Sequence, residues 1–185
     1  MYRPLRSMVP LAAAAAAALL LSGPALAQTF TFASTLTGAA ESPPVATTAG
    51  GSVLVTFDVQ ASSVSVMEWF FGLSAGLSDN HIHCCTVTPL TGNAGVAVGF
   101  TGLPTGATTG SYSHVFTLAP TSFQSLLDGA LAGKSYVNIH TTAFPSGEIR
   151  GFLQLVAATV PEPATYALML SGLAAVGLLA RRRRG

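Results

Sequence analysis

Three histidines have a spacing that could support metal chemistry. His81 and His83 are two positions apart, so on a β-strand both imidazoles point to the same side. His140 lies in a stretch, residues 136–141, where polar and apolar residues alternate as they do in a half-buried strand. If the two strands are neighbours, the three imidazoles converge, and neutral imidazole is a good ligand for copper or zinc. We therefore take His81, His83 and His140 as candidate metal ligands.

A polar pair follows His140 on the hairpin that residues 136–151 are predicted to form. A Pro- and Gly-containing turn separates the two strands, and Glu148 and Arg150 alternate with one apolar residue in the second. Alternation predicts that both lie on the polar face with His140, where Glu148 would be a fourth ligand or would orient one. The alternative is structural: the histidines hydrogen-bond to Glu148, Asn138 and backbone groups and hold the strands together.

Arg150 is expected to belong to a structural network rather than to an active site. A buried ion pair with Glu41, which follows the first predicted strand, would neutralise the guanidinium of Arg150. Asn138 is expected to belong to the same network. The sequence contains no Ser-His-Asp spacing, phosphate-binding loop, paired-carboxylate motif or dinucleotide fingerprint. We therefore expect no catalytic residues and no enzyme activity.

The two ends of the chain read as targeting segments. Arg3 and Arg6 precede a short apolar run and a small-residue site, the pattern of a secretory signal peptide over residues 1–27, cleaved between Ala27 and Gln28. At the other end, residues 164–180 are mostly apolar and could form a helix of about 26 Å, followed by four arginines. This pattern predicts a transient or permanent inner-membrane anchor, with the arginines on the cytoplasmic side.

The C-terminal segment resembles a known sorting signal. Pro161, Glu162 and Pro163 precede the apolar run and the basic terminus, an order similar to the PEP-CTERM signal of Gram-negative bacteria. The resemblance implies recognition by an exosortase-type enzyme, cleavage near the motif and delivery to the cell envelope or the extracellular space. Residues 158–185 would then act as the sorting signal and would contact the membrane before the segment is cleaved.

Residues 28–157 are long enough for one domain with one core. Short strands separated by Gly-, Pro-, Ser- and Thr-rich loops predict an all-β fold, an antiparallel sandwich of immunoglobulin-like or superoxide-dismutase-like Greek-key type. One helix interrupts the strands, with Thr121 as the expected N-cap and Gln124 completing a capping box. With only Lys134 and Arg150 against six acidic residues, this stretch carries a net charge of −4, which argues against nucleic-acid binding.

Cys84 and Cys85 are the only cysteines, in a chain expected to be exported to an oxidising compartment. Their Cα atoms would be about 3.8 Å apart across a trans peptide bond, below the usual disulfide range of about 4.4–6.8 Å. A vicinal disulfide is nevertheless the only bridge available within the chain, and we favour it. Metal ligation beside His83, an intermolecular bridge and two free thiols are the alternatives.

Several sequence blocks of the central domain resemble the CHRD family, first defined as repeats in chordin. They are LTGAAESPPV from Leu36, FGL from Phe71, His81-Ile82-His83, YVNIHT from Tyr136 and GEIRG from Gly147. The resemblance implies an extracellular β-sandwich and little about activity, and the two cysteines after His83 depart from the small residues common in the family. The His-x-His strand is also similar to that of Cu/Zn superoxide dismutase, but no zinc subsite is visible.

The sequence therefore predicts an exported, non-enzymatic binding or structural module of the envelope or extracellular matrix. Its expected partners are the exosortase and exopolysaccharide or envelope proteins, contacted through loops such as residues 46–51 and 101–110. The alternative is a copper- or zinc-binding or redox protein that uses the histidine cluster.

Overall fold

The computed structural model describes residues 28–159 and 165–182 of the chain. Ala27–Thr159 form one compact unit with its own core, and α3 belongs to a second unit. The predicted signal peptide and the Pro161-Glu162-Pro163 motif lie outside the described residues. The elements of the first unit, in chain order, are β1 Thr29–Thr37, the 3-10 turn η1 Gly38–Ala40, β2 Gly50–Asp58, β3 Ser63–Phe71, β4 Leu77–His83, β5 Val96–Gly99, β6 Gly110–Thr117, α2 Pro120–Leu131, β7 Tyr136–Thr141, β8 Ile149–Phe152 and β9 Gln154–Thr159.

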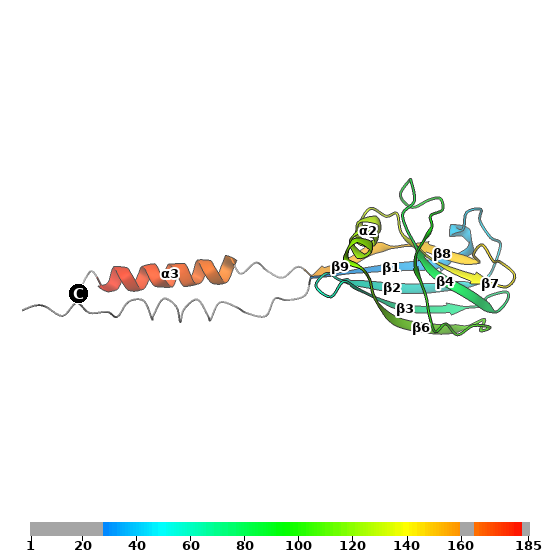
Figure 1. Cartoon of the computed structure of the whole chain (residues 1–185), viewed down its shortest axis with the longest axis horizontal. Coiled ribbons are helices and arrows are strands. Elements are labelled where there is room, and N and C mark those ends of the chain that lie inside the picture. The colour runs from blue at the N-terminus through cyan, green and yellow to red at the C-terminus, as the bar shows by residue number, and fades with distance from the viewer. Residues whose placement is uncertain (1–27, 160–164, 183–185) are drawn as a thin grey trace, which may run out of the picture. The chain divides into compact units, whose positions relative to one another are not determined.

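The unit is all-β and antiparallel, as predicted, and its strands belong to one sheet (Figure 1). The strand order is β5-β4-β7-β8-β1-β2-β3-β6, and β9 also pairs with β1. β1 pairs with β2 along its whole length, whereas its other edge is shared: Thr37 pairs with Arg150 of β8, and Thr29 to Ala33 pair with β9. The two expected layers are thus halves of one sheet that turns at the β1–β8 junction.

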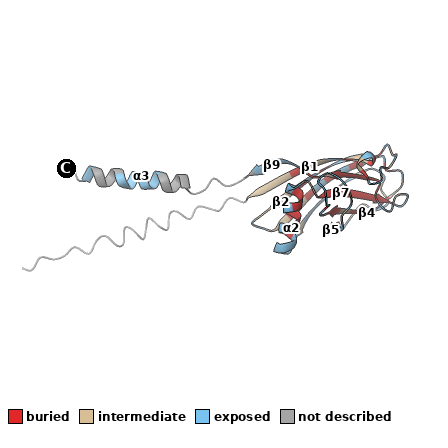
Figure 2. Cartoon of the chain, turned by 90° about the horizontal axis from the view of Figure 1, so that it is seen from above, coloured by how far each residue is buried: buried red, intermediate tan, exposed pale blue. Residues whose placement is uncertain are grey.

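The core lies between the two halves of the curled sheet. Alternation directs one face of β2 and β3 inward, while β4, β7 and β8 contribute residues from the opposite half (Figure 2). Burial of each such side chain stabilises the fold by about 1.5–3 kcal/mol. The fully buried apolar side chains of these strands include Val55, Phe57, Val64, Val66, Ile82, Val137, Ile139 and Ile149.

Helix α2 packs against the core through Phe123, Leu126 and Leu127. The Phe123 ring meets the edge of Phe57 with centroids 5.7 Å apart. The expected capping box is wrong: the helix begins two residues earlier, at Pro120, and the N-cap Ala119 makes no side-chain capping bond. Proline suits this first position, because its fixed φ fits the helix and its missing N–H would have no partner there.

The second unit is described through α3, Thr165–Arg182. None of the helices in the described ranges has the length and apolar character needed to cross a membrane. The membrane-spanning role that the sequence predicted for residues 164–180 is therefore not supported.

Candidate metal centre

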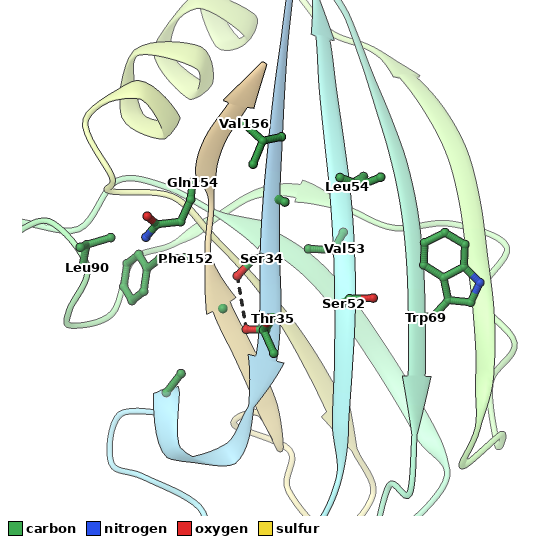
Figure 3. Close-up of a pocket in the computed structure, with 13 residues that line it drawn as sticks. Ser34, Thr35, Ser52, Val53, Leu54, Trp69, Leu90, Phe152, Gln154 and Val156 are labelled. Carbon is green, nitrogen blue, oxygen red and sulfur yellow. Dashed lines mark hydrogen bonds between the residues drawn. The ribbon is translucent and has the colours of Figure 1, made fainter. Parts of the chain in front are cut away.

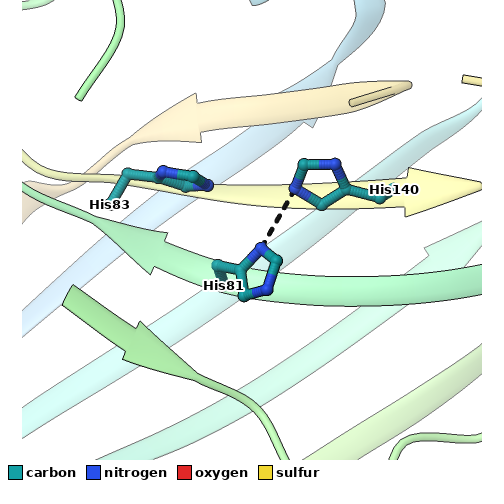
Figure 4. Close-up of side chains that lie close together, drawn as sticks. All are labelled: His81, His83 and His140. Carbon is teal, nitrogen blue, oxygen red and sulfur yellow. Dashed lines mark hydrogen bonds between the residues drawn. The ribbon is translucent and has the colours of Figure 1, made fainter. Parts of the chain in front are cut away.

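Strands β4 and β7 are antiparallel neighbours and bring the three predicted histidines together (Figure 4). The register opposes His81 to Asn138, and alternation places His81, His83 and His140 on the face turned away from the core. One ring nitrogen from each histidine lies within 4.8 Å of the corresponding atoms of the other two. His83 and His140 are buried, and His81 is half-buried.

The hydrogen-bond partners of the rings determine which nitrogens are free. Nδ1 of His83 lies 2.9 Å from the carbonyl oxygen of Ala94, and Nδ1 of His140 lies 2.9 Å from that of Pro145. Because a carbonyl oxygen only accepts hydrogen bonds, each ring donates from Nδ1, and Nε2 carries a lone pair. No hydrogen-bond partner in the described structure reaches the buried Nε2 of His83.

His81 presents its other nitrogen to the cluster. Its Nε2 lies 3.2 Å from a carboxylate oxygen of Asp79 and donates to it, which leaves Nδ1 turned toward the other two rings. That Nδ1 lies 3.1 Å from Nε2 of His140. This hydrogen bond forms when Nδ1 of His81 carries a proton, and a metal ion that binds both nitrogens would take the place of that proton.

Burial favours the neutral forms of His83 and His140. It lowers the pKa of His83 below the ordinary value, opposed by the Ala94 carbonyl and assisted by His81, His140 and Arg150. Burial likewise lowers the pKa of His140, against the opposing effect of the Pro145 carbonyl. Both rings are therefore neutral near pH 7, which is the protonation state that binds copper or zinc.

An aromatic and ionic scaffold fixes His83. Its ring stacks on Tyr136 with centroids 4.7 Å apart, and the backbone N–H of Ala94 donates to the Tyr136 hydroxyl over 3.2 Å. The Arg150 guanidinium lies 4.8 Å from the centre of the Tyr136 ring. It also donates to the carbonyl of Gly92 (3.0 Å) and to the side chain of Asn93 (2.9 Å), so it holds the segment that supplies the Ala94 carbonyl.

The predicted network around Arg150 includes Glu41. A Glu41 carboxylate oxygen lies 3.0 Å from Nε of Arg150, and both side chains are buried. Burial raises the pKa of Glu41 to about 7, against the opposing effect of Arg150. Asn138 is buried beside them, since a Cβ on Gly147 would collide with the side chains of both Asn138 and Glu41.

Glu148 does not join the histidines. Its carboxylate accepts hydrogen bonds from the hydroxyls of Thr47 and Thr141, each over 2.8 Å, and from the backbone N–H of Ser74 over 2.9 Å. Burial acts to raise the pKa of Glu148, but these hydrogen bonds outweigh it and hold the pKa below its ordinary value. Glu148 therefore ties three segments of the chain together as a carboxylate.

Cys84 and Cys85 are joined by a disulfide, and they pack against α2 at Gly129, away from the histidines. His114, on β6, is exposed and lies beside Phe116 with ring centroids 4.6 Å apart, so it stands outside the cluster. It serves as a matched control for the three clustered histidines.

Two further polar groups escaped the sequence analysis. Glu68 of β3 is fully buried, and one of its carboxylate oxygens accepts from the side-chain amide of Asn80, on β4, over 2.6 Å. Burial raises the pKa of Glu68 to about 8. Strand alternation places Glu68 on the core-facing side of β3, so the sequence alone could have indicated that this carboxyl group is buried. Asp79, two residues before His81, was recognisable by the same alternation.

Comparison with known families gives two matches along the chain. The model of the CHRD domain family matches residues 32–153, and the model of the PEP-CTERM protein-sorting motif matches residues 159–184. No curated protein and no solved structure matches the chain.

Proposed function

From the premise that this chain belongs to the CHRD domain family and carries a PEP-CTERM sorting motif, we propose that it is an exported, non-enzymatic envelope module that binds a copper or zinc ion. Export and sorting by an exosortase-type system follow from the motif. The metal site is supported by one observation above all. His81, His83 and His140 each bring one ring nitrogen within 4.8 Å of the other two, and each has its other nitrogen beside an oxygen acceptor.

This arrangement is the one that metal-binding histidines use. A ligating imidazole usually donates its second nitrogen to a carboxylate or a carbonyl, which fixes the tautomer and the ring orientation. Asp79, Ala94 and Pro145 supply these acceptors for His81, His83 and His140. Two nitrogens bound to one tetrahedral zinc ion lie about 3.3 Å apart, so closing the separation of 4.8 Å needs a movement of about 1.5 Å.

Metal titration of the untagged domain, residues 28–159, tests the proposal. We expect one copper or zinc ion per chain by calorimetry and a higher melting temperature. At a free metal concentration of 100 times Kd, the stabilisation would be about 2.7 kcal/mol. His83→Ala and His140→Ala should each abolish stoichiometric binding, whereas His114→Ala should leave it unchanged.

The competing structural role makes a different prediction. If the histidines only hold β4, β7 and the adjoining loops together, His83→Ala and His140→Ala lower stability to the same extent with and without metal. Absence of a stoichiometric metal ion in the wild-type domain, with no effect of either metal on the melting temperature, would exclude the proposed site.

A further inference from the structure

A groove of about 700 Å³ crosses the outer face of the sheet, over β9, β1, β2 and β3 (Figure 3). Trp69 of β3 stands at one side, and Phe152 and Leu90 stand at the other. The volume is within the range of ligand sites, about 300–1,000 Å³. The groove shares no lining residue with the candidate metal centre and is independent of the function proposed above.

The apolar groups of this groove are exposed because of strand alternation. Glu68 and Phe70 point into the core, so Trp69 between them must point outward, and it is 48% exposed. On β2, Leu54 stands between the buried Val53 and Val55 and is 38% exposed. An exposed tryptophan beside further apolar side chains is a usual mark of a binding surface.

The lining between these groups contains polar side chains and no charged ones. Trp69 pairs in register with Ser52, which pairs with Thr35 of β1, so the three form a row across the strands. At about 4.8 Å per strand, the row spans about 10 Å. Ser34 and the amide of Gln154 add further polar groups, and none of the thirteen residues that line the groove is charged.

We propose that this groove binds a strand of neutral polysaccharide, with a sugar ring stacked on Trp69. An indole offers a large apolar face to the C–H face of a pyranose ring, and serine, threonine and glutamine side chains exchange hydrogen bonds with sugar hydroxyls. The absence of charge in the lining matches a neutral ligand. A polyanion is disfavoured, because Lys134 and Arg150 are the only cations of residues 28–159 and Arg150 is buried against Glu41.

Trp69 is the only tryptophan of the chain, so its fluorescence reports directly on the groove. We would titrate residues 28–159 with cellohexaose, laminarihexaose and maltohexaose as neutral probes. At least one should produce a saturable blue shift whose midpoint is the same in 50 mM and 500 mM NaCl. Insensitivity to salt is expected because no ion pair contributes.

Variants locate the binding. In affinity electrophoresis through gels that contain the corresponding polysaccharide, Trp69→Ala should weaken retardation at least tenfold. Leu54→Glu, which introduces a charge at a second exposed side chain of the groove, should do the same and serves if Trp69→Ala is unstable. Val115→Ala removes an apolar side chain that is 60% exposed on β6, outside the groove, and should behave as wild type.

Three results would overturn the proposal. The first is that none of the neutral probes shifts the fluorescence and none of the polysaccharides retards the wild-type domain. The second is that folded Trp69→Ala and Leu54→Glu variants bind as wild type does. The third is concentration-dependent self-association that both variants abolish, which would make the groove a contact between two copies of this chain.

Discussion

At the scale of single residues, this domain buries three glutamates and one arginine: Glu41, Glu68, Glu148 and Arg150. Glu41 and Arg150 neutralise each other across 3.0 Å, whereas Glu68 has no cation beside it and meets only the amide of Asn80. One oxygen of Glu68 and the amide oxygen of Asn80 have no other partner in the described structure. Because burial penalises the unpaired charge, the neutral acid is the favoured form of Glu68 in the folded domain.

Glu68 should make the domain more stable in acid than in alkali. The pKa of Glu68 rises from its ordinary value of 4.5 in the unfolded chain to about 8 in the folded domain, so the folded state binds the proton more tightly. Its stabilising contribution is complete below pH 4.5 and is lost as the pH rises through about 8. Relative to Glu68→Gln, wild type should lose on the order of 4 kcal/mol between pH 5 and pH 9, measured by urea unfolding. Parallel losses in the two proteins would contradict this role.

The ion pair of Glu41 and Arg150 should contribute strongly to stability when only one partner is removed. Glu41→Gln leaves the guanidinium buried without its carboxylate, and we expect a loss of about 3–5 kcal/mol in the free energy of unfolding. Asp128→Asn, at an exposed position on α2, is the control and should change stability by less than about 0.5 kcal/mol. If Glu41→Gln lowers the free energy of unfolding no more than the control does, the ion pair does not contribute to the stability of the domain.

At the scale of elements, strand alternation predicted much of the fold and three residues of the site. It placed His81, His83 and His140 on one face, because the pairing of β4 with β7 is regular from Asp79 to His83, beyond the register shift after Leu77. It did not place Glu148, which precedes β8 and so lies in the turn, where alternation no longer fixes a side chain's direction. The acceptor carbonyls of Ala94 and Pro145 come from irregular segments, whose positions depend on tertiary contacts that spacing does not encode.

The packing of α2 on the disulfide depends on Gly129. A Cβ at this position would collide with both sulfur atoms. Gly129→Ala should therefore destabilise the domain by about 1–3 kcal/mol. This loss is expected even though alanine is more favourable than glycine inside a helix by about 1 kcal/mol. The same substitution in a Cys84→Ala/Cys85→Ala background should cost much less, because the sulfurs are gone. Chemical unfolding of the four proteins measures this coupling. Equal costs in both backgrounds would mean that the disulfide does not determine the need for glycine.

At the scale of the whole molecule, the folded domain and the sorting segment are separable. The buried core residues run from Phe32 to Leu153, within the CHRD match, and the sorting match begins at residue 159. No described core residue comes from α3. Stability and metal binding should therefore reside in residues 28–159, and delivery to the envelope in the residues that follow.

Replacing Pro161, Glu162 and Pro163 with alanine should separate the two roles. In a host with an exosortase, we expect the wild-type chain to lose its C-terminal segment and the variant to keep it, because the sorting match covers this motif. Intact mass of the recovered proteins reads out processing directly. The variant should unfold at the same temperature as wild type and bind copper or zinc with the same affinity, because the CHRD match, the buried core and the three histidines all lie before residue 154. Normal processing of the variant would show that the exosortase recognises another part of the segment. A lowered melting temperature would show that the sorting segment contributes to the stability of the domain.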